Sequence, residues 1–283
     1  MSERMIRLGG VELCTEPFGD RAGTPILLVM GLGASMLWWP EGFCRALAAG
    51  RRFVIRYDHR DTGRSTTYLR GKPGYSGGDL LADAVAVLDA YELTAAHLVG
   101  VSAGGALAQV IALDHPDRVL SLVLVSTSPA LPVGRELPPP REEFGRFLAE
   151  HRVDWSDRAS VVDYRVGYTS MLAGGQRRLD EAELRAFVRR DVDRARDFAA
   201  ARNHEQLAED RRERAPLSSI RAPTLVIHGT ADPLFPIEHG HALAEVIPRA
   251  RLIAVEGAGH GLESIDPRML ADAILEHTRS TDG

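Results

Sequence analysis

The sequence predicts an α/β fold: a mostly parallel central sheet flanked by helices, with an inserted helical cap. Short apolar stretches, such as residues 26–30 and 120–125, alternate with stretches whose apolar residues recur at helical spacing. Strands that are apolar on both sides are typical of a parallel sheet covered on both faces. Residues 129–215, which are rich in proline and charge, interrupt the alternation and are predicted to form the cap.

Taken in order, eight strands are predicted. Residues 5–8 and 11–17 flank Gly9-Gly10 and are expected to form a hairpin at the sheet edge. The other strands are residues 26–30, 53–57, 97–101, 120–125, 224–228 and 251–255. Helices are expected at 41–49, at 79–91 and from the end of the 97–101 strand to Asp114. Residues 1–128 and 216–283 therefore form the predicted core.

Two apolar stripes at helical spacing support a helical cap. The first consists of Phe144, Phe147 and Leu148. The second consists of Leu184, Phe187, Val188, Val192 and Ala195, and it follows Asp180 and Glu183, a plausible capped helix start.

Composition narrows the class of protein. The chain has 283 residues, 45% of them hydrophobic and 26% charged, with a net charge of −5. This balance gives no basic surface, so neither nucleic acid nor an anionic membrane is an expected partner. Cys14 and Cys44 form neither a ligand pattern nor a disulfide framework, and no signal peptide is visible, which favours the cytoplasm. We expect a monomer or homodimer that binds a small molecule.

The most informative motif is Gly-x-Ser-x-Gly at residues 100–104. It lies between an apolar strand and a helix, which is the context of a nucleophile elbow. Such a turn exposes the serine hydroxyl at a helix N-terminus, where developing negative charge is stabilised. Residues 74–78 match the same motif around Ser76, but they follow a polar segment with no strand. Ser102 is therefore the predicted nucleophile, and Ser76 is predicted to lie in a surface loop.

A serine nucleophile needs a base and an acid that orients the base. In folds with this elbow the chain order is serine, acid, histidine, each after a strand. Asp232 follows the 224–228 strand, and His260 follows the 251–255 strand between glycines. The usual alternative place for the acid, after Val125, offers none. His239 and His241 lack a third ligand nearby, so no metal is expected.

The oxyanion hole is expected to use two backbone amides. One belongs to Ala103, just after the nucleophile, and the other to Leu32, with Gly33 as the second choice. Gly31-x-Gly33 is not a dinucleotide-binding fingerprint, because the third glycine position holds Met36. No cofactor is expected.

With these motifs, the sequence resembles members of the α/β-hydrolase superfamily. Within that superfamily it resembles aclacinomycin methylesterases and related hydrolases of bacterial polyketide pathways. The stretches that carry the closer resemblance are residues 28–31, 54–67, 82–89, 109–115 and 277–280. Residues that match this closer pattern are frequent up to about residue 128, less frequent after residue 222 and rare in the cap. The resemblance implies nucleophile, acid and base roles for Ser102, Asp232 and His260. The sequence departs from the family pattern at two positions. Ala103 stands where methionine is common in the family, and Leu32 replaces a smaller residue. Both changes keep the backbone donors but alter the shape of the pocket.

The sequence therefore predicts an esterase that cleaves a carboxylic ester through an acyl-enzyme, with a methyl ester of a bulky aromatic or polyketide-like acid as the expected substrate. A lactonase, a C–C bond hydrolase or a perhydrolase would use the same triad, and a small-molecule receptor without turnover uses the same fold. The residues expected to line a wide apolar pocket are Trp38, Trp39, Phe235, Tyr164, Tyr168 and Met171, with Leu172 as a further cap candidate.

Overall fold

The central sheet organises the molecule. The computed structural model describes residues 2–174, 179–208, 210 and 212–281. Eight strands pair in the order β1-β2-β4-β3-β5-β6-β7-β8. Their bounds are β1 Arg4–Leu8, β2 Val11–Phe18, β3 Thr24–Val29, β4 Arg52–Tyr57, β5 Ala96–Val101, β6 Val119–Val125, β7 Thr224–Gly229 and β8 Arg251–Val255. The β1 and β2 strands pair antiparallel and β2 pairs antiparallel with β4, whereas all later pairings are parallel. The predicted fold class, including the edge hairpin, is confirmed.

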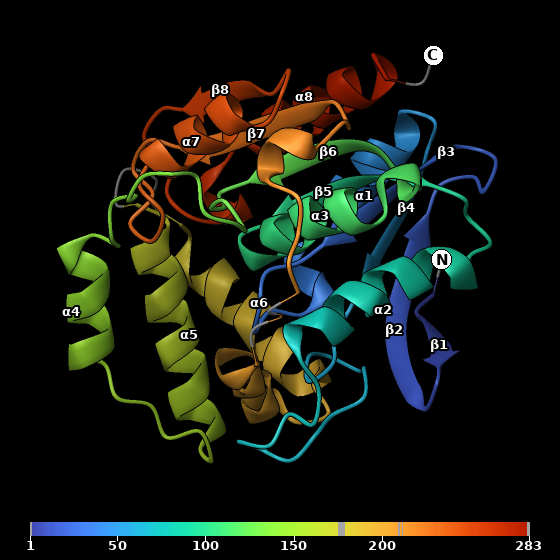
Figure 1. The fold of residues 1–283 in the computed structure, drawn as a ribbon. Helices are drawn as coiled ribbons and strands as arrows, with labels where there is room; N and C mark the ends of the chain where they lie inside the picture. Colours follow the sequence, from blue (N-terminus) through green and yellow to red (C-terminus); the bar gives the residue numbers. More distant parts are fainter. Residues whose placement is uncertain (1, 175–178, 209, 211, 282–283) are drawn as a thin grey trace.

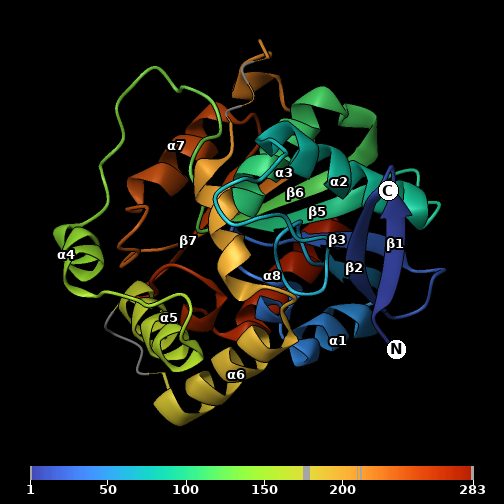
Figure 2. The ribbon, with the colours of Figure 1, turned by 90° about the horizontal axis from the view of Figure 1, so that it is seen from below.

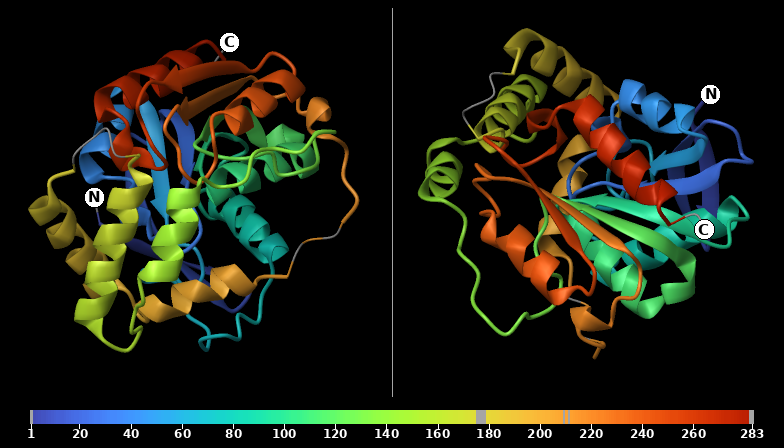
Figure 3. Two further views of the ribbon diagram at one scale, coloured as in Figure 1. Left: turned by 90° about the vertical axis from the view of Figure 1, so that its left-hand side faces the viewer. Right: turned by 90° about the horizontal axis from the view of Figure 1, so that it is seen from above.

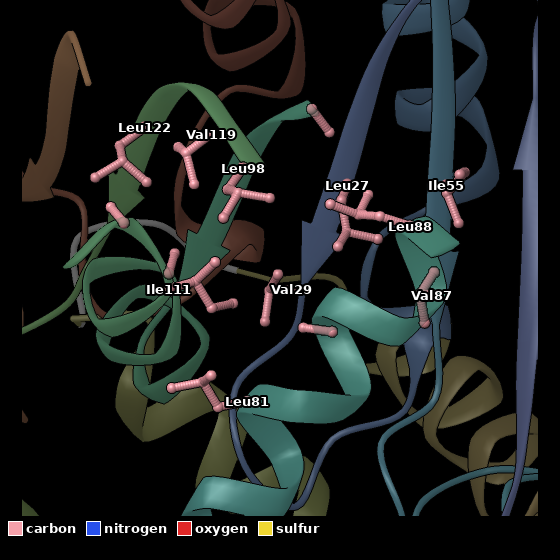
Figure 4. Packing of buried hydrophobic residues seen from close by; sticks show 14 of the residues in the cluster. Leu27, Val29, Ile55, Leu81, Val87, Leu88, Leu98, Ile111, Val119 and Leu122 are labelled. Carbon is pink, nitrogen blue, oxygen red and sulfur yellow. The ribbon is translucent and has the colours of Figure 1, made fainter. Parts of the chain in front are cut away.

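Helices cover both faces of this sheet (Figure 1). The helices of the core are α1 Glu41–Ala49, α2 Gly77–Ala90, α3 Ala103–Asp114, α7 Glu238–Val246 and α8 Pro267–Arg279. One apolar cluster joins the sheet to α2, α3 and α7, and a second joins its other face to α1 and α8. Figure 4 shows the first cluster, in which Leu81 and Ile111 approach Val29 and Leu98 of the central strands. Strands buried on both faces explain the uninterrupted apolar stretches of the sequence.

In the described part of the chain, several helical elements lie between β6 and the short 3-10 turn η4 Leu217–Ser219 that precedes β7. They are α4 Glu142–Glu150, α5 Arg158–Leu172, α6 Glu181–Arg194 and the 3-10 segment η3 Phe198–Gln206. The α5 helix packs against both α4 and α6, and the group lies to one side of the sheet (Figures 2 and 3). We call residues 129–215 the inserted segment. Its α6 helix starts at the predicted cap, where the Asp180 carboxylate accepts hydrogen bonds from the amides of Ala182 and Glu183.

The parallel strands β5, β7 and β8 all end at the same edge of the sheet. The residues that follow them carry the expected chemistry, because Ser102 comes directly after β5 while Asp232 and His260 lie in the loops after β7 and β8. The order of the strands thus gathers side chains from three distant parts of the sequence.

Within the described part of the chain, the helices are too short or too polar to cross a lipid bilayer.

Candidate active site

Ser102 occupies a strained turn between β5 and α3. Its backbone has φ 53° and ψ −126°, a conformation that a non-glycine residue adopts only when its surroundings impose it. The neighbouring glycines explain how the turn is accommodated. A Cβ atom on Gly100 would overlap the backbone of Gly104, and one on Gly104 would overlap the carbonyl oxygens of Val29 and Met30. The Gly-x-Ser-x-Gly motif is therefore a packing requirement of this turn.

The second match to the motif has a different local structure. Ser76 caps the N-terminus of α2, and its amide and hydroxyl both donate to the Asp79 carboxylate, at 2.8 and 2.7 Å. This reciprocal capping starts α2 at Gly77, two residues before the predicted start. Residues 58–76, which separate β4 from α2, form no strand, so Ser76 is not presented at the end of one.

Asp232 and His260 are in direct contact. His260 Nδ1 lies 2.9 Å from Asp232 Oδ2, and both side chains are buried. The other carboxylate oxygen, Oδ1, accepts hydrogen bonds from the amides of Leu234 and Phe235, each at 2.8 Å. Burial acts to raise the pKa of Asp232, but His260 and the backbone donors outweigh it and the pKa is lowered. An ionised Asp232 holds the proton on Nδ1, which leaves Nε2 of a neutral His260 free to accept one.

His228, which the sequence suggests is a structural strand residue, completes the surroundings of Asp232. Its Nε2 donates to the carbonyl oxygen of Phe235 at 2.7 Å and lies 3.5 Å from Asp232 Oδ2. Burial lowers the pKa of His228, so this ring is neutral. The Phe235 ring meets the His260 ring edge-on, with centroids 5.5 Å apart. Asp232 thus faces two backbone amides and two histidines. Of the two histidines, His260 lies within normal hydrogen-bond distance, whereas His228 lies farther away.

Ser102 is half-buried at the sheet edge. Its amide donates to the carbonyl of Val125 at 2.9 Å, and its carbonyl accepts from the Thr127 hydroxyl at 2.6 Å. Among the residues that the structure describes, its own hydroxyl makes no hydrogen bond, to His260 or to another group. The backbone of Gly31 faces it closely, since a Cβ atom on Gly31 would lie 3.3 Å from Ser102 Cβ.

The amides of Leu32 and Gly33, in the loop after β3, differ in their hydrogen bonding. The Gly33 amide is occupied, because it donates to His204 Nδ1 at 2.8 Å. Across the described ranges, neither the Leu32 amide, in this loop, nor the Ala103 amide, at the start of α3, donates to an acceptor elsewhere in the chain. This difference favours Leu32 over Gly33 as the second oxyanion donor.

His204 is a site residue that sequence reasoning missed. It comes from η3 and bridges two core loops, since its Nδ1 accepts from Gly33 and its Nε2 donates to the Arg60 carbonyl at 2.8 Å. Burial lowers the pKa of His204 to about 4, so the ring is neutral at physiological pH. No local pattern in the sequence connects residue 204 to residue 33.

The aromatic residues expected to line the pocket divide into different groups. Tyr164 and Tyr168 line a cavity of about 340 Å³ together with Leu32 and Gly33. Trp38 borders a second cavity, of about 320 Å³, between the core and α6. Phe235 and Met171 line neither of these two cavities.

The expectation for Trp39 is wrong. Its side chain is 0% exposed and packs in the core, stacked on Phe43 with ring centroids 5.8 Å apart. The adjacent Trp38 points the other way and donates from Nε1 to Asp191 at 2.9 Å. Successive residues leave the tight turn at Met36–Trp38 in different directions, so only one of the two rings reaches a cavity.

Glu263 is a second residue that the sequence did not single out. It lies three residues after His260 and borders the 320 Å³ cavity. Burial raises the pKa of Glu263 to about 7, although a hydrogen bond from its own backbone and the charge of Arg165 act in the opposite direction. Near neutral pH this carboxyl is therefore partly protonated beside the candidate base.

The inserted segment touches the histidine loop as well. The amide of His260 donates to the carbonyl of Leu172, at the end of α5, at 2.7 Å. Gly259 allows this approach, because a Cβ atom there would overlap the backbone of Leu172 and Ala173. Over the described residues, no group of three His, Cys, Asp or Glu side chains is placed to hold a metal ion.

A strained serine at an elbow and an aspartate–histidine pair at the same sheet edge define a hydrolase-type site. The chain belongs to the α/β-hydrolase fold family, whose model matches residues 24–262. It is 36% identical to rhodomycin D methylesterase DauP of Streptomyces sp. (strain C5), over 99% of both chains. It is 35% identical to rhodomycin D methylesterase DnrP of Streptomyces peucetius, again over 99% of both. These relatives confirm the resemblance to the methylesterase group.

Solved structures agree on the fold. The esterase RhEst1 from Rhodococcus sp. ECU1013 superimposes with a TM-score of 0.79, covering 99% of this chain and all of that one, at 23% sequence identity. At this identity the likeness concerns the fold alone.

Proposed function

We propose that this protein is a serine ester hydrolase in which Ser102, His260 and Asp232 act as nucleophile, base and orienting acid. The observation that carries the proposal is the 2.9 Å contact of Asp232 with His260 Nδ1, at the same sheet edge as the strained Ser102. This contact fixes the tautomer in which Nε2 accepts a proton. The full-length similarity to two methylesterases supports the same reaction class.

The reaction proceeds in two halves. Ser102 Oγ bonds to the ester carbonyl carbon as its proton passes to His260 Nε2, and the amides of Leu32 and Ala103 donate to the resulting oxyanion. The carbon–oxygen bond to the alcohol then breaks, and His260 returns the proton to the leaving alcohol oxygen. Water attacks the acyl-enzyme with the same histidine as base, which releases the acid and restores Ser102. Hydrogen bonds of this kind are often long before substrate binds.

We further propose that the substrate is a methyl ester of a bulky aromatic acid. The aromatic walls of the 340 Å³ cavity beside Leu32 suit a flat acyl part, and methanol needs little room as the leaving group. The relatives named above are methylesterases by their descriptions. In this proposal residues 129–215 act as a cap over the site, on a core formed by residues 1–128 and 216–283.

The test compares the serines of the two matches to Gly-x-Ser-x-Gly, Ser102 and Ser76. Ser102→Ala is expected to lower kcat for a simple aryl acetate by about 10⁴–10⁶, whereas Ser76→Ala leaves kcat within about twofold of the wild type. Steady-state turnover and thermal unfolding are measured for all three proteins. Loss of activity in the Ser76 variant with retention in the Ser102 variant would overturn the assignment.

A panel of methyl esters, lactones and aryl esters defines the substrate class. Methyl esters of polycyclic acids are expected to exceed short-chain esters and simple lactones in kcat/KM. If short-chain esters or lactones are better by tenfold, about 1.4 kcal/mol in transition-state binding, the substrate proposal is wrong while the hydrolase proposal stands.

A further inference from the structure

Arg165 lies among aromatic rings at the inner side of α5. Its guanidinium carbon is 5.4 Å from the ring centroid of Trp38, 5.8 Å from that of Tyr168 and 5.7 Å from that of Phe198. These rings come from the core, from α5 and from η3, so the guanidinium occupies the place where the inserted segment meets the core. Such contacts stabilise a cation, but ring faces do not satisfy the five directed N–H donors of a guanidinium.

In the part of the chain that the structure describes, Arg165 forms no ion pair. No carboxylate lies within 4 Å of it, and its Nε is buried without a hydrogen-bond partner. Other arginines of the inserted segment are paired: Arg185 with Asp163, Arg194 with Asp58, and Arg202 with Glu205. Arg165 itself is half-buried, and its terminal nitrogens are donors that a ligand oxygen can satisfy.

The position of Arg165 connects it to the candidate active site. It lines the 340 Å³ cavity together with Leu32, whose amide is the proposed oxyanion donor, and with Tyr164 and Tyr168. Its charge also acts on Glu263, three residues from His260. A ligand that fills this cavity therefore contacts both Arg165 and the Leu32 loop.

If Arg165 had a purely structural role, its surroundings would resemble those of Arg190. That arginine also lies over a ring, 5.4 Å from the centroid of Phe187, but it is exposed and water satisfies its donors. Arg165 differs because it lines the 340 Å³ cavity and is held there between the rings of Trp38, Tyr168 and Phe198. Only its Nε is shielded, so the terminal nitrogens are the donors that a ligand in the cavity would meet.

We propose that Arg165 binds an anionic oxygen, a carboxylate or an ionised phenol, on the acyl part of a planar aromatic ester. The proposal rests on the proposed ester hydrolase function and narrows its substrate class. The guanidinium supplies a charge-assisted hydrogen bond, and the surrounding rings supply flat apolar contact.

The experiment uses two methyl esters of equal shape, methyl 6-carboxy-2-naphthoate and its neutral analogue methyl 6-carbamoyl-2-naphthoate, with the 1,4- and 2,7-isomers of each pair. The wild type is expected to prefer the carboxylate by about 10- to 100-fold in kcat/KM for at least one isomer. Arg165→Gln abolishes this preference, Arg165→Lys restores part of it, and Arg190→Gln keeps it whole. Phenyl acetate, which carries no anion, reports any general effect on catalysis: Arg190→Gln leaves its hydrolysis within threefold of the wild type. The preference is a ratio of kcat/KM values within each variant, so a general loss of kcat in an Arg165 variant cancels from it.

Equal rates of wild-type protein on the charged and neutral esters would overturn the proposal, and so would an unchanged preference in Arg165→Gln. If that variant fails to fold, inhibition of wild-type phenyl acetate hydrolysis decides: naphthalene-2,6-dicarboxylate must inhibit at least tenfold more tightly than its diamide.

Failure of the proposed function gives a different result. In that case the wild type does not turn over phenyl acetate, and calorimetry of naphthalene-2,6-dicarboxylate tests Arg165 alone. Binding to wild type that Arg165→Gln weakens at least tenfold supports the anion site without an esterase, and equal or absent binding refutes it.

Discussion

Gly104→Ala is the substitution whose effect follows most directly from the structure. Gly104 is the second residue of α3, immediately beyond the elbow, and it lies against the end of β3. An ideal Cβ atom at this position would be 2.5 Å from the carbonyl oxygen of Met30 and would overlap that of Val29. Both obstacles are backbone atoms of a central strand, so no side chain can rotate out of the way. The N-terminus of α3 must therefore move away from β3.

The size of the effect can be worked out from that overlap. To bring the Met30 contact to 3.0 Å, the helix must retreat by at least about 0.5 Å. Overpacking of this kind costs about 1–3 kcal/mol, more than the ~1 kcal/mol that alanine gains over glycine in a helix. The displacement also separates the Ala103 amide from the Leu32 amide. Because loss of one oxyanion donor costs about 10²–10³ in kcat, we expect kcat to fall by about 10²-fold or more with little change in KM.

Gly42→Ala is the matched control. Gly42 is exposed in α1, and a Cβ atom there would meet nothing within 4 Å. The same chemical change should therefore stabilise the protein by up to about 1 kcal/mol and leave kcat unchanged. Urea unfolding at 25 °C and aryl acetate turnover measure both quantities. Similar stability and kcat in the two variants would refute the steric account of the elbow.

Two further predictions concern ionisable groups. Asp232→Asn is expected to lower kcat by about 10⁴ with the far-UV spectrum unchanged, because the amide no longer selects the Nδ1–H tautomer of His260; activity near the wild-type level would argue for a different acid. For Glu263, the folded pKa of about 7 lies above the ordinary 4.5, so the unfolded state loses its proton first as pH rises. The ionised Glu263 carboxyl therefore lowers the free energy of unfolding by an amount that grows between about pH 4.5 and 7 and is constant above pH 7. Glu263→Gln should raise the free energy of unfolding by about 1–3 kcal/mol at pH 8, and the gain should shrink toward zero by pH 5. A gain independent of pH would contradict the assigned pKa.

The sequence predicts those site residues that depend on local chain order. Ser102, Asp232 and His260 each follow a strand, and parallel strands end at a common edge, so strand recognition was enough to expect the three loops together. The contact between Asp232 and His260 agrees with that expectation. The elbow was recognisable because its glycines serve a steric need that any such turn has.

Residues brought in by the inserted segment were not predictable in the same way. His204 and Arg165 of this segment matter because of what packs against them, and so does Glu263 of the core. His204, for example, bonds to Gly33, which lies 171 residues away in the chain. Helical periodicity shows which face of α5 is apolar, but it does not show which core loop that face meets. The pair Trp38 and Trp39 makes the same point at shorter range, since one residue of separation decides between cavity and core.

The contacts of the inserted segment bear on how the site works. His204 of the inserted segment accepts a hydrogen bond from Gly33, in the loop of the proposed oxyanion donor. The Leu172 carbonyl, also in the segment, accepts a hydrogen bond from the backbone amide of His260. Buried bonds from Arg194 to Asp58 and from Trp38 and Ser35 to Asp191 join α6 to the core between these points. A segment bonded to both loops of the proposed active site cannot lift as a whole without releasing them. We therefore expect the inserted segment to position the catalytic groups as well as to select the substrate, so that changes within it alter kcat together with specificity.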